Sequence, residues 1–482
     1  MHRADRSPPA DPFGASARAA TRRVLGALRA LPPEWRDALL YGCAALFAVG
    51  IGFATGIPLY RQWGQLACGP YAAAAAIMAL VAAAHRSAGA RPARARTAAR
   101  VIAFLIVLFG ATAVPLALEV VWRSQGSPAR HVQPEVVVVE QAGERAATGH
   151  DPYRVVDHNG HIVAHPRSEP VYELYYPYLP GMVIFGLSSD AKGESRLTDA
   201  RIQFLAFTAV VGLVALSRLR PRTDARFRAL QVLTVLPTAA LPLATGGDDM
   251  PVVALMLAGL VALQRRRPVL AGLALGAASS LKFTAWPLMV LALFAARDRY
   301  GCRAIGRYVL GVVAVSGPVV LPFAVRNPSA FVDNVVRYPL GLAGVSSPAA
   351  SALPGHILVA LVPGAHRAYV VIVALAGVAA LGWCLRRRPP STAAQVASLG
   401  GWVMLIAILL APATRVGYLL YPINLFVWAW MLRRSEQPAV PAAPGWPGSA
   451  RAQLSSDSSN SSTENGVIPA DVVGETTAPT SQ

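Results

Sequence analysis

Long apolar stretches without charge most constrain what this chain can fold into. Residues 38–58 read ALLYGCAALFAVGIGFATGIP, and residues 101–118 read VIAFLIVLFGATAVPLAL. A transmembrane helix needs about 20 such residues to cross the hydrocarbon core of a bilayer. Only 14% of the chain is charged, whereas soluble domains carry about 25% charged residues. The sequence therefore predicts an all-α polytopic membrane protein.

The positive charge of the chain gathers in short arginine clusters between the apolar stretches. The formal net charge is +19, and the only lysines are Lys192 and Lys282. A basic excess can indicate nucleic-acid binding, but clusters between apolar stretches follow the positive-inside rule of membrane proteins. We therefore expect no nucleic-acid partner and place these clusters in the cytoplasm. They lie at residues 1–36, 86–100, 217–228, 265–267, 297–303, 386–388 and 433–434.

This assignment predicts a multi-pass protein of the plasma membrane, with both termini in the cytoplasm and about 12 transmembrane helices. The stretch 268–296 is too long for one span, and KFTAWP interrupts it. We therefore interpret it as a hairpin of two short helices. Single helices are expected at residues 38–58, 65–84, 101–118, 202–216, 229–246, 250–264, 308–325, 368–385, 393–411 and 416–432.

The same path divides the chain into a basic cytoplasmic segment (1–36), a transmembrane domain (37–435) and a cytoplasmic tail (436–482). The tail is rich in Ser, Pro and Ala and is predicted to be disordered. Residues 119–200 and 326–367 form long loops outside the cytoplasm, and loops of this length are usually functional or disordered.

Metal binding has little support in the sequence. The four cysteines show no CxxC pair and no metal-ligand spacing. A histidine motif in the first outer loop has a spacing that suits a metal, but its glycine and polar neighbours favour a flexible loop. Its members are His158, His161 and His165. We predict neither a metal nor another cofactor.

Three charged residues lie where the topology places the outer ends of apolar helices. A charge within an apolar span is costly and marks a candidate site. Lys282 can bind an anion such as a lipid phosphate, or it can extend along a helix end to the membrane surface. Asp248 and Asp249 begin a helix, and N-capping explains one of them but not the pair.

Two aromatic segments on the same side add further candidates. Arg415, with Tyr418 and Tyr421 beside it, either binds phosphate through its planar fork or belongs to an interfacial aromatic belt. The segment EPVYELYYPYLPG (169–181) contains Tyr175, Tyr176 and Tyr178. Tyrosine rings can cover a sugar and donate hydrogen bonds to it, and they are also common at membrane interfaces.

The segment QPEVVVVEQAGERAATGHDPY (133–153) supplies the carboxylates of the first outer loop. Glu135 follows Pro134 directly, close to where the chain leaves the membrane. Glu140 and Glu144 are four residues apart and share one face if the segment is helical. We expect that face to be solvated or interfacial.

The order of these motifs resembles the GT-C glycosyltransferases, above all glycosyltransferase family 87. That family includes the polyprenol-phosphate-mannose-dependent mannosyltransferases of actinobacterial cell envelopes. The likeness covers residues 100–432: Glu135, the valines after it, EQAGERAATG and DPY follow the family's outer loop in order. RRRPVLAGLALGAASSLKFTAWPL is similar to its hairpin, and LAPATRVGYLLYP is similar to its closing segment. The family's acid is usually Asp, and two extra helices precede the loop here, as in a divergent member.

The resemblance implies an inverting membrane hexosyltransferase. It would move a hexose, first of all mannose, from a polyprenyl-phosphate sugar donor to an extracytoplasmic envelope glycolipid or glycan acceptor. Glu135 would be the general base, with Glu140 as second choice, and Lys282 and Arg415 would bind the donor phosphate. The sugar and acceptor pocket would be shaped by Asp248, Asp249, Tyr175, Tyr176, Tyr178 and Tyr418.

Two other functions fit part of the pattern. A transporter or flippase for lipid-linked sugars would also use charges and a lipid groove, but such proteins usually show internal repeats and charges near the bilayer centre. A non-catalytic scaffold for envelope assembly would tolerate replacement of the outer carboxylates.

Overall fold

A computed structural model describes Gly26 and residues 30–87, 93–126, 131–153, 170–188, 196–219, 223–345 and 347–436. The regular elements of this part of the chain are helices, and one isolated bridge joins Ala350 to Thr414. Most of the basic segment 1–36, the histidine motif (His158, His161 and His165) and the tail beyond Glu436 lie outside the described residues.

Eight helices among the described residues are long and apolar enough to cross a membrane. They are α2 (Pro33–Ala54), α3 (Pro58–Ser87), the run of α4 (Ala93–Val107), η1 (Leu108–Ala113) and α5 (Val114–Gln125), α7 (Ala200–Ser217), α8 (Thr223–Thr234) with α9 (Pro237–Thr245), α13 (Cys302–Arg326), α16 (His366–Arg387) and α17 (Ala393–Leu410). The protein is therefore a polytopic membrane protein, as the apolar stretches predicted.

Four shorter helices complete the set of predicted spans: α10 (Asp249–Gln264), α11 (Pro268–Leu281), α12 (Trp286–Tyr300) and α18 (Leu420–Glu436). The expected total of about 12 spans is reached only if these short helices also cross. The hairpin expected at 268–296 is present as α11 and α12, with the one-turn helix η5 (Phe283–Ala285) between them.

The described parts of the two long loops contain several short helices. The first contains α6 (Pro134–Ala147), η3 (Val171–Leu174) and η4 (Pro180–Phe185). The second contains α14 (Pro328–Val332), η6 (Asp333–Arg337), α15 (Pro354–Leu361) and η7 (Pro363–Ala365), and η8 (Val416–Leu419) precedes α18. Helix α5 also continues to Gln125, beyond the predicted end at residue 118.

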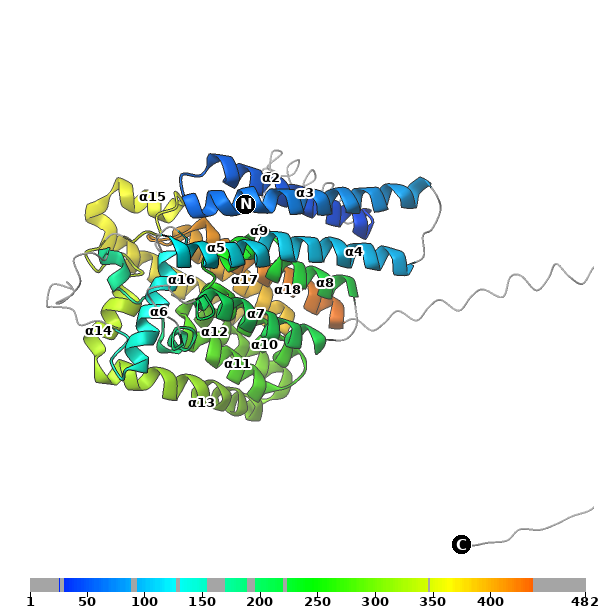
Figure 1. Ribbon diagram of the computed structural model, residues 1–482. Helices are drawn as coiled ribbons and strands as arrows, with labels where there is room; N and C mark the ends of the chain where they lie inside the picture. Colours follow the sequence, from blue (N-terminus) through cyan, green and yellow to red (C-terminus); the bar gives the residue numbers. More distant parts are fainter. Residues whose placement is uncertain are drawn as a thin grey trace, which may run out of the picture. The chain divides into compact units, whose positions relative to one another are not determined.

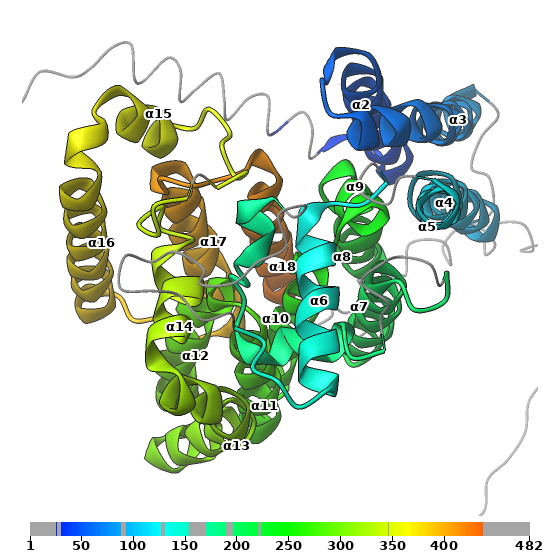
Figure 2. The ribbon, with the colours of Figure 1, turned by 60° about the vertical axis from the view of Figure 1, so that its left-hand side comes forward.

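Helix α10 occupies the centre of the larger hydrophobic core. Its sequence DMPVVALMLAGLVALQ is apolar on all sides, which is typical of a helix buried on every face. It contacts α7, α8, α9, α11, α12, α17 and α18, several of which surround it in Figure 2. The N-terminal end of α10 therefore brings Asp248 and Asp249 into the middle of the bundle.

A second hydrophobic cluster joins the N-terminal helices to α8 and α9. Helix α3 packs along α2 and α4, and the side-by-side course of α3 and α4 is visible in Figure 1. Its buried Trp63 donates a hydrogen bond to the carbonyl of Ala111 in η1 (2.8 Å), where the π-helical turn interrupts the α-helical ladder.

Glycines allow α11 and α13 to approach each other closely. A Cβ atom on Gly272 would lie 2.1 Å from the carbonyl oxygen of Tyr308, and one on Gly311 would lie 2.4 Å from that of Val269. Small residues at such positions let two helix backbones come into contact. This contact fixes α11, whose C-terminal end leads into Lys282.

Candidate active site

A cavity of about 250 Å³ lies where several turns between helices meet. Its walls come from the N-terminal end of α6, the segment around η3, the break between α11 and α12, residues 338–349 and the segment from α17 to η8. The sequence-predicted site residues that line it are Glu135, Tyr175, Tyr178, Lys282, Arg415 and Tyr418.

Lys282 lies at the break between α11 and α12. Its backbone is extended (φ −151°, ψ 139°), and Pro287, the second residue of α12, has no N–H that could continue a hydrogen-bond ladder from α11. Its Nζ donates hydrogen bonds to Asp248 Oδ2 (2.9 Å) and to Asp249 Oδ1 (2.5 Å). The same Nζ lies 5.1 Å from the ring centroid of Tyr178, a distance typical of a cation–π contact.

The two aspartates are not explained by helix capping. Asp248 precedes α10 and makes no side-chain cap hydrogen bond, so both carboxylates instead share one ammonium group. Asp249 Oδ1 also accepts a hydrogen bond from the hydroxyl of Tyr421 (2.5 Å), which in turn accepts one from Thr284 (2.8 Å). Tyr421 and Thr284 were not among the predicted site residues, although Tyr421 follows Tyr418 by three positions in the same aromatic segment.

Glu135 is placed at the cavity by the start of α6. Pro134 occupies the first helical position, and a carboxylate in the first turn is favoured by the helix dipole. Glu135 Oε1 forms an ion pair with Nη1 of Arg415, which belongs to the segment between α17 and η8. Its other oxygen, Oε2, is buried and accepts no hydrogen bond from any described residue.

The pKa of Glu135 lies above its ordinary value. Burial disfavours the charged form and is the largest cause, and the neighbouring charge of Asp248 acts in the same direction. The positive charges of Arg415 and Lys282 oppose this rise without cancelling it. A carboxylate with a raised pKa is a stronger base than an exposed one.

The segment before α6 is tied to the turn between α9 and α10. The backbone N–H of Gln133 donates to the carbonyl of Thr245 (3.0 Å), and its side-chain Nε2 donates to Thr245 Oγ1 (2.8 Å) and to the hydroxyl of Tyr60 (3.0 Å). Gly246 leaves room for this amide, because a Cβ atom there would lie 2.3 Å from Gln133 Oε1. These contacts bring Glu135 close to Lys282 and its two partners, Asp248 and Asp249.

The three tyrosines of the η3 segment have different surroundings. Tyr178 and Tyr175 line the cavity, and the ring of Tyr175 stacks on Tyr338 at 4.7 Å. Tyr176 does not line it: its backbone N–H donates to Asn334 Oδ1 (2.8 Å), and its ring packs against Tyr153 within the hydrophobic core. Tyr176 is therefore positioned to support the fold of this segment rather than to contact a ligand in the cavity.

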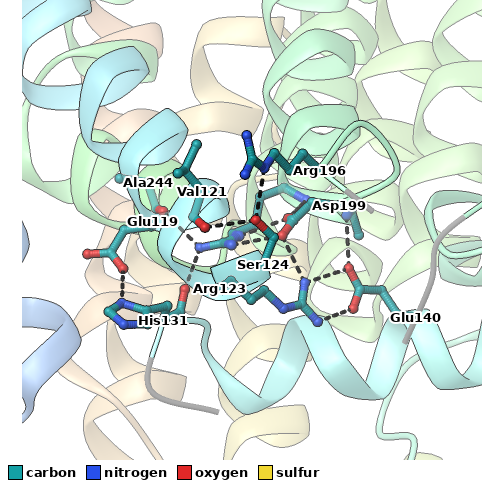
Figure 3. Close-up of polar contacts among 11 residues, drawn as sticks. Glu119, Val121, Arg123, Ser124, His131, Glu140, Arg196, Asp199 and Ala244 are labelled. Atoms are coloured by element: carbon teal, nitrogen blue, oxygen red, sulfur yellow. Dashed lines mark hydrogen bonds and ion pairs between the residues drawn. The ribbon is translucent and has the colours of Figure 1, made fainter. Parts of the chain in front are cut away.

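Glu140 belongs to a different set of contacts, which we call the buried ion cluster (Arg123, Glu140, Asp199 and Arg201). Arg123 forms a two-pronged pair with Glu140, at 3.0 and 2.6 Å, and donates to Asp199 Oδ2 at 2.8 Å, as Figure 3 shows. The expectation of a solvated or interfacial face is wrong for Glu140, which is fully buried, whereas Glu144 is exposed. Glu140 is also absent from the cavity lining.

Arg201 completes the buried ion cluster. Its Nε and Nη2 donate to the two oxygens of Asp199, both at 2.8 Å. Burial opposes ionisation of Asp199, but the hydrogen bonds and charges of Arg201 and Arg123 outweigh burial and lower its pKa to about 2. The sequence had given Arg123, Asp199 and Arg201 no role, because nothing in their spacing identifies them as partners.

Comparison with known proteins adds one match. Residues 196–412 match the family described as glycosyltransferase family 87. No curated protein and no solved structure matches the chain. The matched range contains Asp248, Asp249 and Lys282, and Glu135 and Arg415 lie before and after it.

Proposed function

We propose that this chain, which carries a glycosyltransferase family 87 domain and is a membrane glycosyltransferase, transfers a hexose from a polyprenyl-phosphate donor. Mannose is the first candidate sugar, and an extracytoplasmic envelope glycolipid or glycan is the acceptor. The observation that carries the proposal is the cavity itself, in which a carboxylate lies near two cations and one of its oxygens accepts no hydrogen bond from the part of the chain that the structure describes.

Glu135 is proposed as the general base. Its Oε2 takes the proton of an acceptor hydroxyl while the acceptor oxygen attacks the anomeric carbon of the donor sugar. The bond between the anomeric carbon and the phosphate oxygen breaks, and the electron pair leaves with the polyprenyl phosphate. Attack from the side opposite to the leaving group inverts the anomeric configuration.

The cations are proposed to stabilise the leaving phosphate. Arg415 has further N–H groups beyond the one that pairs with Glu135, and a guanidinium matches phosphate geometry. Lys282 contributes a positive charge beside the same cavity. Positive groups held where negative charge develops lower the energy barrier to departure of the phosphate. In this mechanism the side chains of Arg415 and Lys282 stabilise that charge.

The ion pair between Glu135 and Arg415 suggests how the two roles are coupled. Three carboxylates, Glu135, Asp248 and Asp249, share two cations here, so the site has a formal charge of −1. When the donor phosphate binds Arg415, this cation turns away from Glu135. Glu135 then has both oxygens available for the acceptor hydroxyl.

The apolar side of the cavity supports a lipid-linked substrate. Met404, Ala407 and Ile408 of α17 line it together with Phe283 and Pro287. Side chains of this kind suit an isoprenoid chain better than a soluble nucleotide sugar. We place the lipid tail along this wall, with the phosphate toward Arg415 and Lys282.

The arginine clusters support a site outside the cytoplasm. Helix α10 starts at the site and ends beside Arg265, and α12 starts at the site and ends beside Arg297. Helix α18 likewise runs from the cavity segment to Arg433. By the positive-inside rule these arginine-bearing ends face the cytoplasm, so the cavity faces outward in the plasma membrane.

The remaining parts of the proposal concern the chain ends and cofactors. We retain a basic cytoplasmic segment (1–36), a GT-C-like domain (37–435) and a cytoplasmic tail (436–482), with both termini inside. The described residues contain no group of three or more His, Cys, Asp and Glu side chains able to hold a metal ion. Tyr175, Tyr178 and Tyr418, as cavity-lining residues, are assigned to the sugar and acceptor pocket.

The test is a transfer assay with purified protein. It is incubated in detergent with radiolabelled polyprenyl-phosphate-mannose and an extract of envelope lipids, and parallel samples contain the arabinose and glucose donors. Label in a new acceptor lipid or glycan supports the proposal and identifies the sugar. A flippase would instead move the unchanged donor across liposomes, and that result with no product would overturn the proposal.

A further inference from the structure

Arg201 touches both chain segments that carry the carboxylates of the site. Its side chain is fully buried, and its Nη1 donates to the carbonyl of His131 at 2.8 Å and to that of Ala244 at 3.5 Å. His131 lies four residues before Glu135, and Ala244 lies four residues before Asp248. One guanidinium therefore joins the segment that leads to the proposed base, Glu135, to the segment that leads to Asp248 and Asp249.

The direction of the Arg201 side chain is fixed by Asp199. Both carboxylate oxygens of Asp199 accept from Arg201, and the backbone N–H of Arg201 also donates to Asp199 Oδ1 at 3.0 Å. Arg123 holds the same carboxylate from the other side and pairs with Glu140 of α6, as Figure 3 shows. The guanidinium of Arg201 is thus held in one orientation, in which its Nη1 points toward the carbonyls of His131 and Ala244.

We propose that Arg201 is a positioning residue that sets where Glu135 lies relative to Asp248 and the bound acceptor. This inference rests on the proposed function, in which Glu135 is the base. Gln133 also joins these two segments, closer to Glu135, because its side chain donates a hydrogen bond to Thr245. A displacement of about 1 Å at a reacting group can reduce the rate by about 10²-fold even when the changed residue is remote.

The first test is Arg201→Lys, which keeps the charge but cannot bind Asp199 and both carbonyls at once. We expect kcat to fall roughly 10- to 100-fold, while KM for the donor changes less than about threefold, because ground-state binding is retained. The acidic limb of the pH profile of kcat/KM should also move to lower pH, because a displaced Glu135 is less buried.

The charges around Glu135 decide how the pH profile is interpreted. Arg415, Asp248 and Lys282 influence its ionisation directly. The tyrosines that face it are Tyr60, Tyr172, Tyr178, Tyr338 and Tyr418. None of these residues is changed in Arg201→Lys, so a shift of the acidic limb reports on Glu135 itself.

A double variant separates positioning from general stability. If Arg201 acts through Glu135, then Arg201→Lys/Glu135→Gln should have the residual activity of Glu135→Gln within about twofold, because the second change has no further partner to displace. A purely structural role predicts that the two losses multiply and that the pH profile of Arg201→Lys matches that of the unchanged protein. That pattern would overturn the inference.

Thr245→Val provides a test that buries no unpaired charge, in case Arg201→Lys does not fold. It removes the hydroxyl that accepts from Gln133 and should move the acidic limb in the same direction by a smaller amount. Unchanged pH dependence in this variant also counts against the inference. If Glu135→Gln retains full transfer, the base assignment fails; if it loses transfer but Arg201→Lys and Thr245→Val behave like the unchanged protein, only the positioning role fails.

Discussion

Glu135 and Glu140 lie five residues apart on the same helix, yet their surroundings differ in almost every respect. Both oxygens of Glu140 accept hydrogen bonds from Arg123, and one also accepts from the backbone N–H of Ala200 at 3.0 Å. Glu135 pairs with Arg415 through one oxygen, and its other oxygen accepts no hydrogen bond from a described residue. Glu135 also lines the cavity, whereas Glu140 does not.

The difference shows how a carboxylate that holds a structure can be told from one available for chemistry. The buried ion cluster contains two acids and two arginines, and its charges balance. A network of this kind is costly to disturb, because each removed partner leaves a buried group unsatisfied. The cavity instead is lined by Glu135, Lys282 and Arg415, and one oxygen of Glu135 accepts no hydrogen bond from a described residue, so this oxygen is available to an acceptor hydroxyl.

The strongest test of this contrast is Glu135→Gln. The amide keeps the shape of the side chain but cannot take a proton, so we expect transfer to fall by about 10²- to 10⁴-fold. The melting temperature in detergent should fall as well, because Arg415 loses its charged partner, although the amide oxygen can still accept a hydrogen bond from it; transfer is therefore compared per folded molecule. Glu144→Gln is the matched control, since Glu144 is exposed on the same helix. Equal activity in both variants would remove Glu135 from the mechanism.

Lys282→Met should produce the next largest effect. Loss of the ammonium removes a cation from beside the cavity and leaves Asp248 and Asp249 without their partner. We expect transfer to fall on the order of 10²-fold, together with a lower melting temperature.

A second variant distinguishes the two roles of Lys282. Lys282→Met/Asp249→Asn removes one of the two like charges and should recover part of the lost stability. If Lys282 acts on the substrate, transfer stays low in this variant. Recovery of transfer along with stability would mean that Lys282 only neutralises the aspartates.

Many of the helices could be predicted from local features of the sequence. Apolar length defined the spans, and KFTAWP marked the break that presents Lys282, whereas the choice of Glu135 as base depended on the family resemblance. These signals are local, because they depend on helix length, on proline chemistry and on where charge interrupts an apolar run.

The partners of the charged residues could not be predicted in the same way. Arg415 is far from Glu135 in sequence, and Arg123 seemed to be a loop charge beyond the end of a span. In the structure α5 continues through Arg123, because Glu140 and Asp199 neutralise its charge inside the protein. The spacing of apolar residues shows which face of a helix is apolar, but tertiary packing decides which charged side chains form ion pairs.

Tyr421→Phe should have a smaller effect on transfer. The change removes the hydroxyl that donates to Asp249 and accepts from Thr284, but Lys282 still holds Asp249. Loss of one such hydrogen bond corresponds to about 1 kcal/mol, or roughly a fivefold decrease in kcat/KM. Tyr308→Phe is the control, since its hydroxyl donates to the carbonyl of Met289 away from the cavity. A similar loss of kcat/KM in both variants would indicate a general packing effect.

Glu140→Gln should have the smallest effect on transfer and a large effect on stability. Arg123 would keep Asp199 but lose its charged partner in α6, so unfolding should become easier by about 3 kcal/mol. Transfer per folded molecule should stay within about threefold of the unchanged protein, because α6 is still held at its start by Gln133 and by Arg201 through His131. Thermal melts in detergent and the transfer assay measure the two effects on the same preparation. If Glu140→Gln abolished transfer at unchanged stability, Glu140 would become the base and the contrast between the two carboxylates would be reversed.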